Sequence, residues 1–285
     1  MHVWSKLSPV RWADAWMERL GGFHGVQVVI TEVPGRKTVR VEAFCESAQD
    51  AKAIAAAFGG TVRPVKHQNW AAMAPEPSEP ILIRKSLVVV DADTPKKIAS
   101  MAKMHPNREV VAVPPELAFG TGHHATTETV LGFVADEATE HQRAGTGWTV
   151  CDLGCGSGIL GIAARKLGAK KVWGCDFDPL AIKVAKANII RNGVDKTKFV
   201  QADVLKWEPK EKWDMVLANI FFDVLMQAFP TIVKALKPGG TLVVSGILKS
   251  YADECLAAAE EVGIEWTKKV TKKNKWVSAK GRLKE

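Results

Sequence analysis

The sequence lacks several features that would place it outside the ordinary globular proteins. Its 285 residues contain no run of 18 apolar residues, so no membrane-spanning helix is expected. The N-terminal stretch, MHVWSKLSPVRWADAW, has no apolar core of signal-peptide length. Cysteine is sparse and forms no C-x-x-C pair, so we expect reduced thiols in a cytoplasmic protein. The five cysteines are Cys45, Cys151, Cys155, Cys175 and Cys255.

Positive charge is concentrated at the C-terminal end. The chain carries a net charge of +8, and residues 267–285 hold eight Lys or Arg against one Glu. One interpretation is a solvated hairpin at a sheet edge, because lysine on an edge strand discourages aberrant pairing. The other is a weak contact with RNA or an acidic partner. Only Trp276 offers a ring for base stacking, so we prefer the edge hairpin.

The first 66 residues show the pattern β-α-β-β-α-β, which is typical of a small ferredoxin-like α+β domain. A strand is expected at residues 2–7, and Ser8 and Pro9 are interpreted as the cap and first-turn proline of a helix over residues 10–20. This region contains no catalytic constellation and suits docking of a partner. The other expected elements are strands at 26–33, 38–45 and 61–67 and a helix within 47–60.

Residues 67–79 have the composition of a linker, with prolines and no apolar period. From residue 80 to 285 the pattern changes to alternating strands and helices, beginning with an extended stretch at 81–90. Repeated βα units predict a doubly wound, mostly parallel α/β sheet, whose ligands bind at the carboxyl ends of the strands. The last residues, 251–285, are expected to form a helix and a hairpin.

The stretch CDLGCGSGILG, residues 151–161, fits two cofactor-binding patterns. Gly156, Gly158 and Gly161 have the G-x-G-x-x-G spacing of a dinucleotide-binding loop. Asp152 with Gly154, Gly156 and Gly158 is similar to the D-x-G-x-G-x-G loop by which class I methyltransferases hold S-adenosylmethionine. A dinucleotide loop requires a strand that runs directly into Gly156, and Gly154 would interrupt it. The second pattern, with a strand at TVCDL and a turn beginning at Gly154, is therefore the better fit.

Three polar residues end the strands that follow. Asp176 can accept both ribose hydroxyls of either cofactor, or can be an ordinary turn residue. Asp203 can reach an adenine amino group, with an exposed strand-end acid as an equally good interpretation. Asn219 stands where amino-methyltransferases carry an Asn or Asp whose oxygen accepts hydrogen bonds from the target amine. A strand-end Asn also makes turns, but beside the glycine loop we favour the catalytic role.

The segment LAFGTGHHATT, residues 117–127, precedes a helix and contains two adjacent histidines. No Cys, Asp or third His stands nearby at ligand spacing, so we expect no metal site. A loop that folds over the cofactor is the preferred interpretation.

These motifs together resemble the PrmA family, bacterial methyltransferases that modify protein eleven of the large ribosomal subunit. The matching stretches lie between residues 114 and 250: LAFGTGHHATT, CDLGCGSGIL, CDFDPLAI, LANI and LVVSGILKS. The resemblance implies a ferredoxin-like substrate-recognition domain (1–66), a linker (67–79) and a class I, Rossmann-like methyltransferase domain (80–285). It also implies contacts with S-adenosylmethionine. The implied residues are Thr127, Gly154, Asp176 and Asn219, with Gly156 and Gly158 lining the loop and Phe119 and Thr121 closing over it.

The implied activity is S-adenosylmethionine-dependent N-methylation of lysine and/or N-terminal amines of a large-subunit ribosomal protein, free or ribosome-bound. Asn219 and a neighbouring backbone carbonyl would orient the amine, so that catalysis is mainly positioning. A methyltransferase acting on another protein or a small molecule is one alternative. A non-catalytic ribosome- or RNA-binding module is another, and an NAD-dependent oxidoreductase is disfavoured by Gly154.

Overall fold

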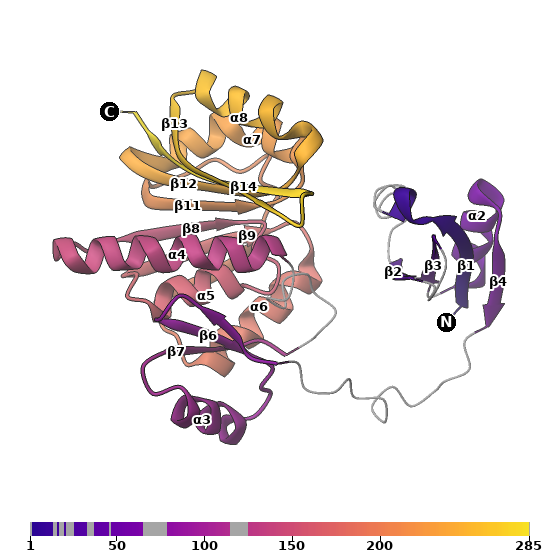
Figure 1. Ribbon diagram of the computed structural model, residues 1–285, viewed down its shortest axis with the longest axis horizontal. Helices are drawn as coiled ribbons and strands as arrows, with labels where there is room; N and C mark the ends of the chain where they lie inside the picture. The colour runs from indigo at the N-terminus through magenta and orange to yellow at the C-terminus, as the bar shows by residue number, and fades with distance from the viewer. Residues whose placement is uncertain are drawn as a thin grey trace. The chain divides into compact units, whose positions relative to one another are not determined.

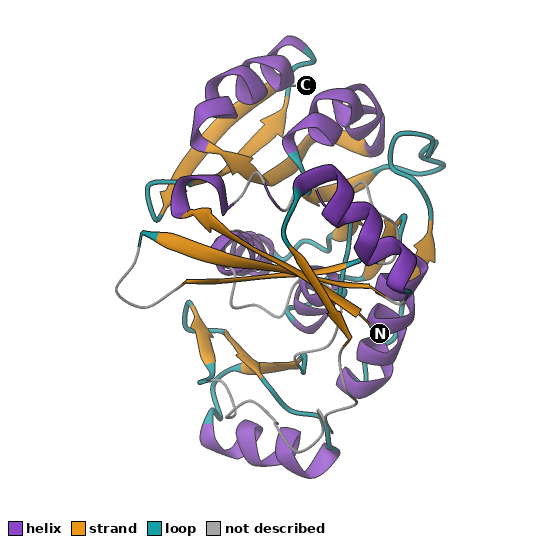
Figure 2. Ribbon diagram, turned by 90° about the vertical axis from the view of Figure 1, so that its right-hand side faces the viewer, coloured by secondary structure: helices purple, strands orange, loops and turns teal. Residues whose placement is uncertain are grey.

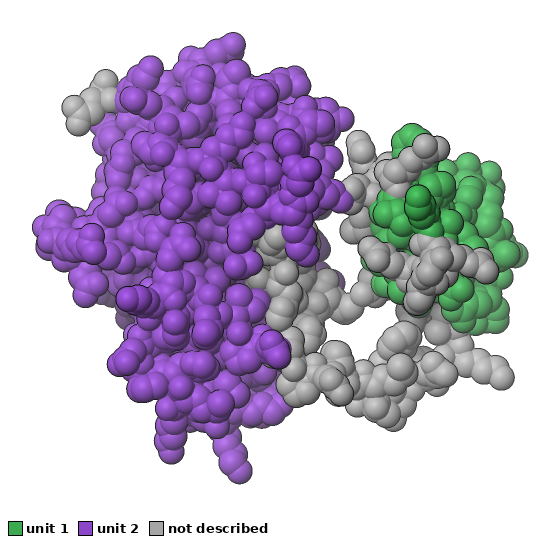
Figure 3. All heavy atoms as spheres, in the orientation of Figure 1, with its two compact units in different colours: residues 1–76 green, residues 77–285 purple. Residues whose placement is uncertain are grey.

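A computed structural model of the chain shows two compact units, residues 1–76 and 77–285, drawn in separate colours in Figure 3. The structure describes residues 2–13, 16, 20, 26–32, 37–45, 47–64, 79–114 and 125–284. Each unit is considered by itself. The predicted boundaries at residues 66 and 79 stay a prediction, and most of the predicted linker lies outside the described residues.

The first unit is a four-stranded antiparallel sheet in the order β2-β3-β1-β4. Because β1 lies between β3 and β4, the strands of each βαβ half are separated, as in the expected split arrangement. Ser47 caps α2 by accepting a hydrogen bond from the Asp50 N–H at 3.1 Å. The elements are β1 (His2–Pro9), η1 (Val10–Trp12), β2 (Gln27–Glu32), β3 (Thr38–Cys45), α2 (Ala48–Phe58) and β4 (Thr61–Pro64).

The predicted helix cap at Ser8 is wrong. Strand β1 continues through Pro9, and Ser8 lies inside the strand, paired with Val39 of β3. The buried Ser8 hydroxyl accepts a hydrogen bond from the Trp16 indole N–H at 2.7 Å. Pairing across the sheet and this buried bond therefore override the local capping signal.

The second unit is built on a seven-stranded sheet in the order β10-β9-β8-β11-β12-β14-β13 (Figure 1). The first five strands are parallel, and β14 and β13 form an antiparallel hairpin at the edge. The doubly wound α/β prediction is confirmed, because the chain order reverses between β8 and β11. The strands are β8 (Thr149–Leu153), β9 (Lys171–Asp176), β10 (Thr197–Gln201), β11 (Trp213–Asn219), β12 (Leu236–Leu248), β13 (Ile264–Lys272) and β14 (Trp276–Leu283).

Helices cover both faces of this sheet. Apolar residues of α4, α5 and α6 pack on one face, and those of α7 and α8 pack on the other (Figure 1). Alternate residues of the central strands enter the two cores, as strand geometry requires. The helices are α4 (Ala125–Ala144), α5 (Ile159–Lys166), α6 (Pro179–Asn192), α7 (Phe222–Ala235) and α8 (Ala252–Glu261), with η3 (Lys249–Tyr251) before α8.

A separate three-stranded sheet precedes the main one, with α3 (Pro95–Met104) between its second and third strands (Figure 2). The expectation of one extended stretch at 81–90 is wrong, because the chain reverses at Arg84, whose φ is 49°. Arg84 then donates to Asp136 on α4 at 2.7 Å. The strands are β5 (Ile81–Ile83), β6 (Leu87–Val90) and β7 (Glu109–Ala112).

The Lys-rich end forms the predicted edge hairpin, and several of its charges are paired within the chain. Lys280 is only 8% exposed and contacts the buried Glu137 of α4 at 2.6 Å. Such pairs hold the hairpin against helices α4 and α8 of the same unit. The paired basic residues are Lys268, Lys269, Lys272, Lys280 and Arg282.

All five cysteines are buried and none is in a disulfide. Burial raises the pKa of Cys175 and Cys255 to about 12, so these thiols are poor nucleophiles. In the described part of the chain, no helix has the length and apolar character needed to cross a membrane.

Candidate active site

The glycine loop begins where β8 ends, at the carboxyl edge of the sheet. Strand β8 stops at Leu153, and Gly154, Gly156 and Gly158 have φ values of 68°, 53° and 77°. These left-handed conformations favour glycine because they are strained for residues that carry a Cβ. The turn therefore starts at Gly154, as the D-x-G-x-G-x-G pattern predicts.

Two of these glycines are also required by packing inside the protein. A Cβ added to Gly154 would lie 2.2 Å from Cγ2 of Ile220, and one added to Gly158 would lie 2.7 Å from Cε2 of Phe199. Close approach of a ligand is therefore an incomplete explanation of the loop. The contact with Ile220 joins the loop directly to the end of β11.

Asp176 fixes the conformation of the glycine loop. Its Oδ2 accepts the Gly156 N–H at 2.9 Å and its Oδ1 accepts the Asp178 N–H at 3.0 Å. A carboxylate has about four acceptor sites, so two remain for a ligand. The capping role falls to Asp178, which accepts the Leu180 N–H at 2.8 Å at the start of α6.

Asp152 lies fully buried beneath the same loop. Its Oδ2 accepts the Gly161 N–H at 3.0 Å, whereas its Oδ1 has no hydrogen-bond partner within the described residues. Burial raises the pKa of this carboxyl to about 7. The sequence identified Asp152 only as part of the glycine motif, since burial was not visible there.

Asn219 is the last residue of β11 and lies beside the glycine loop. The strand register pairs Ala218 with Leu153 of β8 and Asn219 with Ser245 of β12. A Cβ on Gly246 would lie 3.5 Å from the Asn219 Oδ1 and 2.7 Å from the Ile220 carbonyl. The absence of a Cβ at Gly246, whose φ is 85°, thus lets β12 pass close to Asn219 and Ile220.

The second unit also contains buried hydroxyl groups. Thr127, in the first turn of α4, is 1% exposed, and its Oγ1 has no partner among the residues that the structure describes. Ser245 and Ser278 share a buried hydrogen bond of 2.6 Å between β12 and β14. The sequence analysis gave these serines no role, and a polar residue inside the apolar run LVVSGIL was the only signal for Ser245.

Asp203 lies two residues beyond the end of β10. Its Oδ1 accepts the Leu205 N–H at 3.0 Å, and Lys206 approaches its Oδ2 at 3.5 Å. These contacts are those of an exposed turn residue, so an adenine contact stays a prediction. Phe119 and Thr121 lie outside the described residues, as do both histidines of the same segment. Within the described ranges, no group of three potential metal ligands is gathered.

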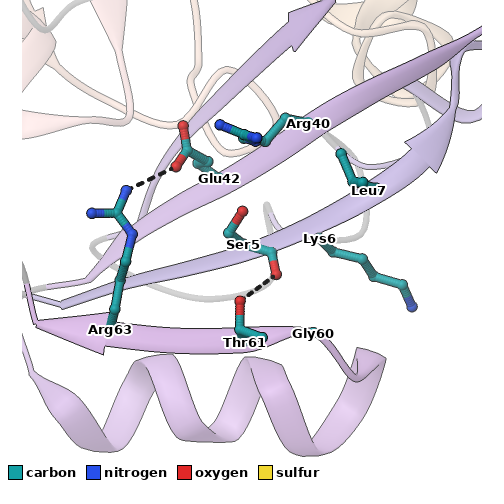
Figure 4. A pocket seen from close by; sticks show the side chains of 8 residues that line it. All are labelled: Ser5, Lys6, Leu7, Arg40, Glu42, Gly60, Thr61 and Arg63. Carbon is teal, nitrogen blue, oxygen red and sulfur yellow. Dashed lines mark hydrogen bonds and ion pairs between the residues drawn. The ribbon is translucent and has the colours of Figure 1, made fainter. Parts of the chain in front are cut away.

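The first unit contains a shallow hollow on β1, β3 and β4 (Figure 4). Arg63 pairs with Glu42 across it at 3.3 Å, and the Thr61 hydroxyl donates to the Ser5 carbonyl at 3.4 Å. The residues that line the hollow carry charges of both signs and include no catalytic set. Its lining residues are Ser5, Lys6, Leu7, Arg40, Glu42, Gly60, Thr61 and Arg63.

Comparison with known families decides what kind of site the glycine loop belongs to. The profile of the family described as "Ribosomal protein L11 methyltransferase (PrmA)" matches residues 23–284. The chain belongs to the PrmA family. Its resemblance to that family, inferred from the motifs, is thereby confirmed.

Several relatives in the PrmA family are named ribosomal protein L11 methyltransferase. The one from Caldanaerobacter subterraneus subsp. tengcongensis is 36% identical over 203 residues, which are 70% of this chain and 60% of that protein. The one from Dechloromonas aromatica is 35% identical over 236 residues, covering 79% and 73%. The crystal structure of ribosomal protein L11 methylase from Lactobacillus delbrueckii subsp. bulgaricus has a TM-score of 0.60 and 26% identity, covering 73% of this chain and all of that one.

The residues at the PrmA-type loop fit S-adenosylmethionine. Asp176 has acceptor sites left for a nucleoside ligand, and the buried Thr127 hydroxyl, which has no hydrogen-bond partner among the described residues, could pair with a polar group of such a ligand. The loop leads into the N-terminus of α5, whose free N–H groups favour a carboxylate.

Proposed function

We propose that the chain is an S-adenosylmethionine-dependent N-methyltransferase whose substrate is ribosomal protein L11 of the large subunit. The names of the relatives support this substrate, although the chain spans only 60% of the first of them. The observation that carries the proposal is the position of Asn219, directly beside a glycine loop that Asp176 holds in place.

Each group at this edge has a role in holding the cofactor. Asp176 would accept the ribose hydroxyls, Thr127 would contact the cofactor, and Gly154, Gly156 and Gly158 would form the loop around its amino-acid part. Bound S-adenosylmethionine would supply an electrophilic methyl group on a sulfonium sulfur.

The chemistry that the chain itself must supply is orientation of a neutral amine. A lysine side chain, with a pKa of about 10.4, is mostly protonated at pH 7, whereas an α-amino group with a pKa of about 8 is neutral more often. A poorly solvated site disfavours the ammonium form. The Asn219 Oδ1 would accept one N–H of the amine and direct its lone pair toward the methyl carbon. Positioning of this kind lowers a barrier by about 7–11 kcal/mol in the best cases.

Substrate choice is assigned to the first unit. Its sheet hollow combines Lys6, Arg40, Arg63 and Glu42, which suits a protein surface of mixed charge. A contact between RNA and the Lys-rich hairpin stays a prediction, and the ion pairs of five of its basic residues favour the structural role. A cytoplasmic location likewise stays a prediction.

A transfer assay tests the proposal. Recombinant L11 is incubated with the chain and with S-adenosylmethionine carrying a labelled methyl group, and the label in L11 is located by peptide mass spectrometry. We expect label on lysine or N-terminal nitrogen. Label on another protein of a ribosomal extract but not on L11 would favour the alternative substrate, and no label at all would refute the enzyme.

A further inference from the structure

Exposed apolar side chains of the second unit gather at the carboxyl edge of its main sheet. Eight large apolar residues in the described part of this unit are between 40% and 81% exposed, and five of them lie within four residues of the ends of strands β9, β10, β11 and β12. Exposed apolar residues scattered singly need no explanation, but a group beside a candidate site does. The five are Phe177, Leu180, Leu205, Phe221 and Tyr251.

Three aromatic residues lie just beyond the ends of the neighbouring strands β11 and β12, and are here named the aromatic rim: Phe221, Phe222 and Tyr251. Phe222 and Tyr251 stack with their ring centres 4.8 Å apart and their planes at 17°. This stack joins the start of α7 to η3 and thus has a structural explanation. The exposure of Phe221 has no such structural explanation. Its side chain is 75% exposed, and it lies only two residues after Asn219.

The chemistry of the rim matches an amine that carries positive charge. Aromatic faces attract ammonium groups, and they bind methylated ammonium groups in the same way. Asp223, in the first turn of α7, adds a negative charge two residues from Phe221. The alkyl stem of a lysine would cover the apolar surface of Phe221, and its charged end would meet the ring face.

We propose that the aromatic rim receives the target lysine side chain and holds its methylated forms between successive transfers. This inference rests on the proposed function, since it concerns the amine that Asn219 orients. The lysine ammonium binds at Phe221, loses its proton to solvent, and moves to Asn219 as a neutral amine. After transfer the methylated ammonium returns to the ring while S-adenosylhomocysteine leaves and S-adenosylmethionine takes its place. The ammonium then loses a proton to solvent, so the same lysine is methylated again before it leaves.

Variants at Phe221 distinguish the contribution of its aromatic face from that of its apolar surface area. Phe221→Leu keeps an apolar side chain without a π face, and Phe221→Trp keeps the face. Ile190→Ala is the matched control, because Ile190 is 81% exposed near the far end of α6. With L11 as substrate, we expect Phe221→Leu to raise KM about tenfold and to give mainly singly methylated lysine at low conversion. We expect Phe221→Trp and Ile190→Ala to retain the wild-type KM and the multiply methylated products.

A binding measurement tests the rim without any transfer to L11. The full chain, with S-adenosylhomocysteine added, is titrated with N-acetyl-trimethyllysine methylamide and with its uncharged analogue, in which carbon replaces the side-chain nitrogen. We expect the charged probe to bind about tenfold more tightly to the wild type, and the preference to vanish in Phe221→Leu and to persist in Phe221→Trp.

The two experiments also distinguish failure of the rim from failure of the proposed function. A wild-type chain that prefers the charged probe but does not methylate L11 supports the rim and refutes the L11 substrate. Equal binding of the two probes by the wild type refutes the rim, whatever the transfer assay shows. An unchanged KM and product pattern in Phe221→Leu refutes it as well.

Discussion

A carboxyl group without exposed surface, Asp152, lies beneath the glycine loop. One of its oxygens accepts the Gly161 N–H, and burial raises its pKa to about 7. The folded protein therefore binds a proton more tightly at this group than the unfolded chain does. By linkage, its contribution to stability is greatest at acidic pH and is lost as the pH rises from about 4 through about 7.

Asp152→Asn should remove this dependence, because the amide keeps an acceptor for Gly161 and does not ionise. Between pH 5 and pH 8 we expect the free energy of unfolding of the wild type to fall relative to the variant by about 1–3 kcal/mol. Urea unfolding at both pH values measures the difference. An equal pH dependence in the two proteins would show that Asp152 does not ionise in this range.

Asp176 holds the glycine loop, and we propose that it also binds the ribose; one substitution tests both roles. Asp176→Ala removes the proposed ribose contact and also the acceptor of the Gly156 N–H. We expect S-adenosylmethionine affinity to fall by about 1.5–3 kcal/mol, measured by calorimetry. Thermal unfolding of the cofactor-free protein is the control for the loop contact. Unchanged affinity would contradict the ribose role.

At the scale of elements, the edge hairpin is held to α4 by buried charge. Glu137 is 1% exposed and contacts Lys280 at 2.6 Å, Arg282 at 3.5 Å and the Thr241 hydroxyl at 2.8 Å. A buried carboxylate requires such partners, because its desolvation is otherwise uncompensated. Lys280 and Arg282 belong to the basic group for which a nucleic-acid contact was considered, and both thus have a structural function.

Lys280→Ala should leave the Glu137 carboxylate buried with fewer partners and lower the free energy of unfolding by about 3–5 kcal/mol. Lys284→Ala, which removes an exposed charge from the same strand end, should change it by less than about 0.5 kcal/mol. Denaturant unfolding of both variants makes the comparison. Equal effects would mean that the buried pair does not anchor the hairpin.

Local signals predicted the elements whose ends are set by local bonds. Ser47 and Asp178 cap their helices through bonds to nearby N–H groups, and the glycine turn begins at Gly154 as the motif predicts. The strand conformation of Ser8 was missed because it depends on pairing with β3, which is distant in the chain. The hairpin turn at Arg84 was missed because it requires an arginine in the left-handed conformation. Local pattern is a weak guide wherever a long-range partner competes with it.

The candidate site shows the same division. Asp176 and Asn219 could be singled out because each ends a predictable strand. Ser245 and Ser278 could not, since they are 33 residues apart in the chain and their contact depends on the pairing of β12 with β14. The buried state of Asp152 depends on helix packing over the strand, which no local pattern reports.

At the scale of the whole molecule, the chain divides into a small antiparallel unit and a large doubly wound unit. All described residues assigned to cofactor and amine lie in the large unit. The small unit offers a hollow of mixed charge, and its described residues contain no chemical constellation. We therefore propose that the large unit carries out the chemistry and that the small unit recognises the protein substrate.

Removal of residues 1–79 should separate the two activities. We expect the remaining fragment to bind S-adenosylmethionine within about threefold of the full chain. Methylation of folded L11 should fall by at least about a hundredfold, because docking and effective concentration are lost together. Calorimetry and the transfer assay are run on both proteins. A fragment that methylates folded L11 at full efficiency would show that the first unit is not the recognition module.

Asn219→Ala tests whether the end of β11 aims an amine at a methyl donor held by the glycine loop, as we propose. The measurement is the turnover number with L11 at saturating cofactor and substrate, together with the cofactor dissociation constant. We expect turnover to fall at least about a hundredfold while cofactor affinity falls less than about tenfold, because an interaction with the reacting amine is lost. Wild-type turnover in this variant would show that Asn219 does not orient the amine and is an ordinary strand-end residue.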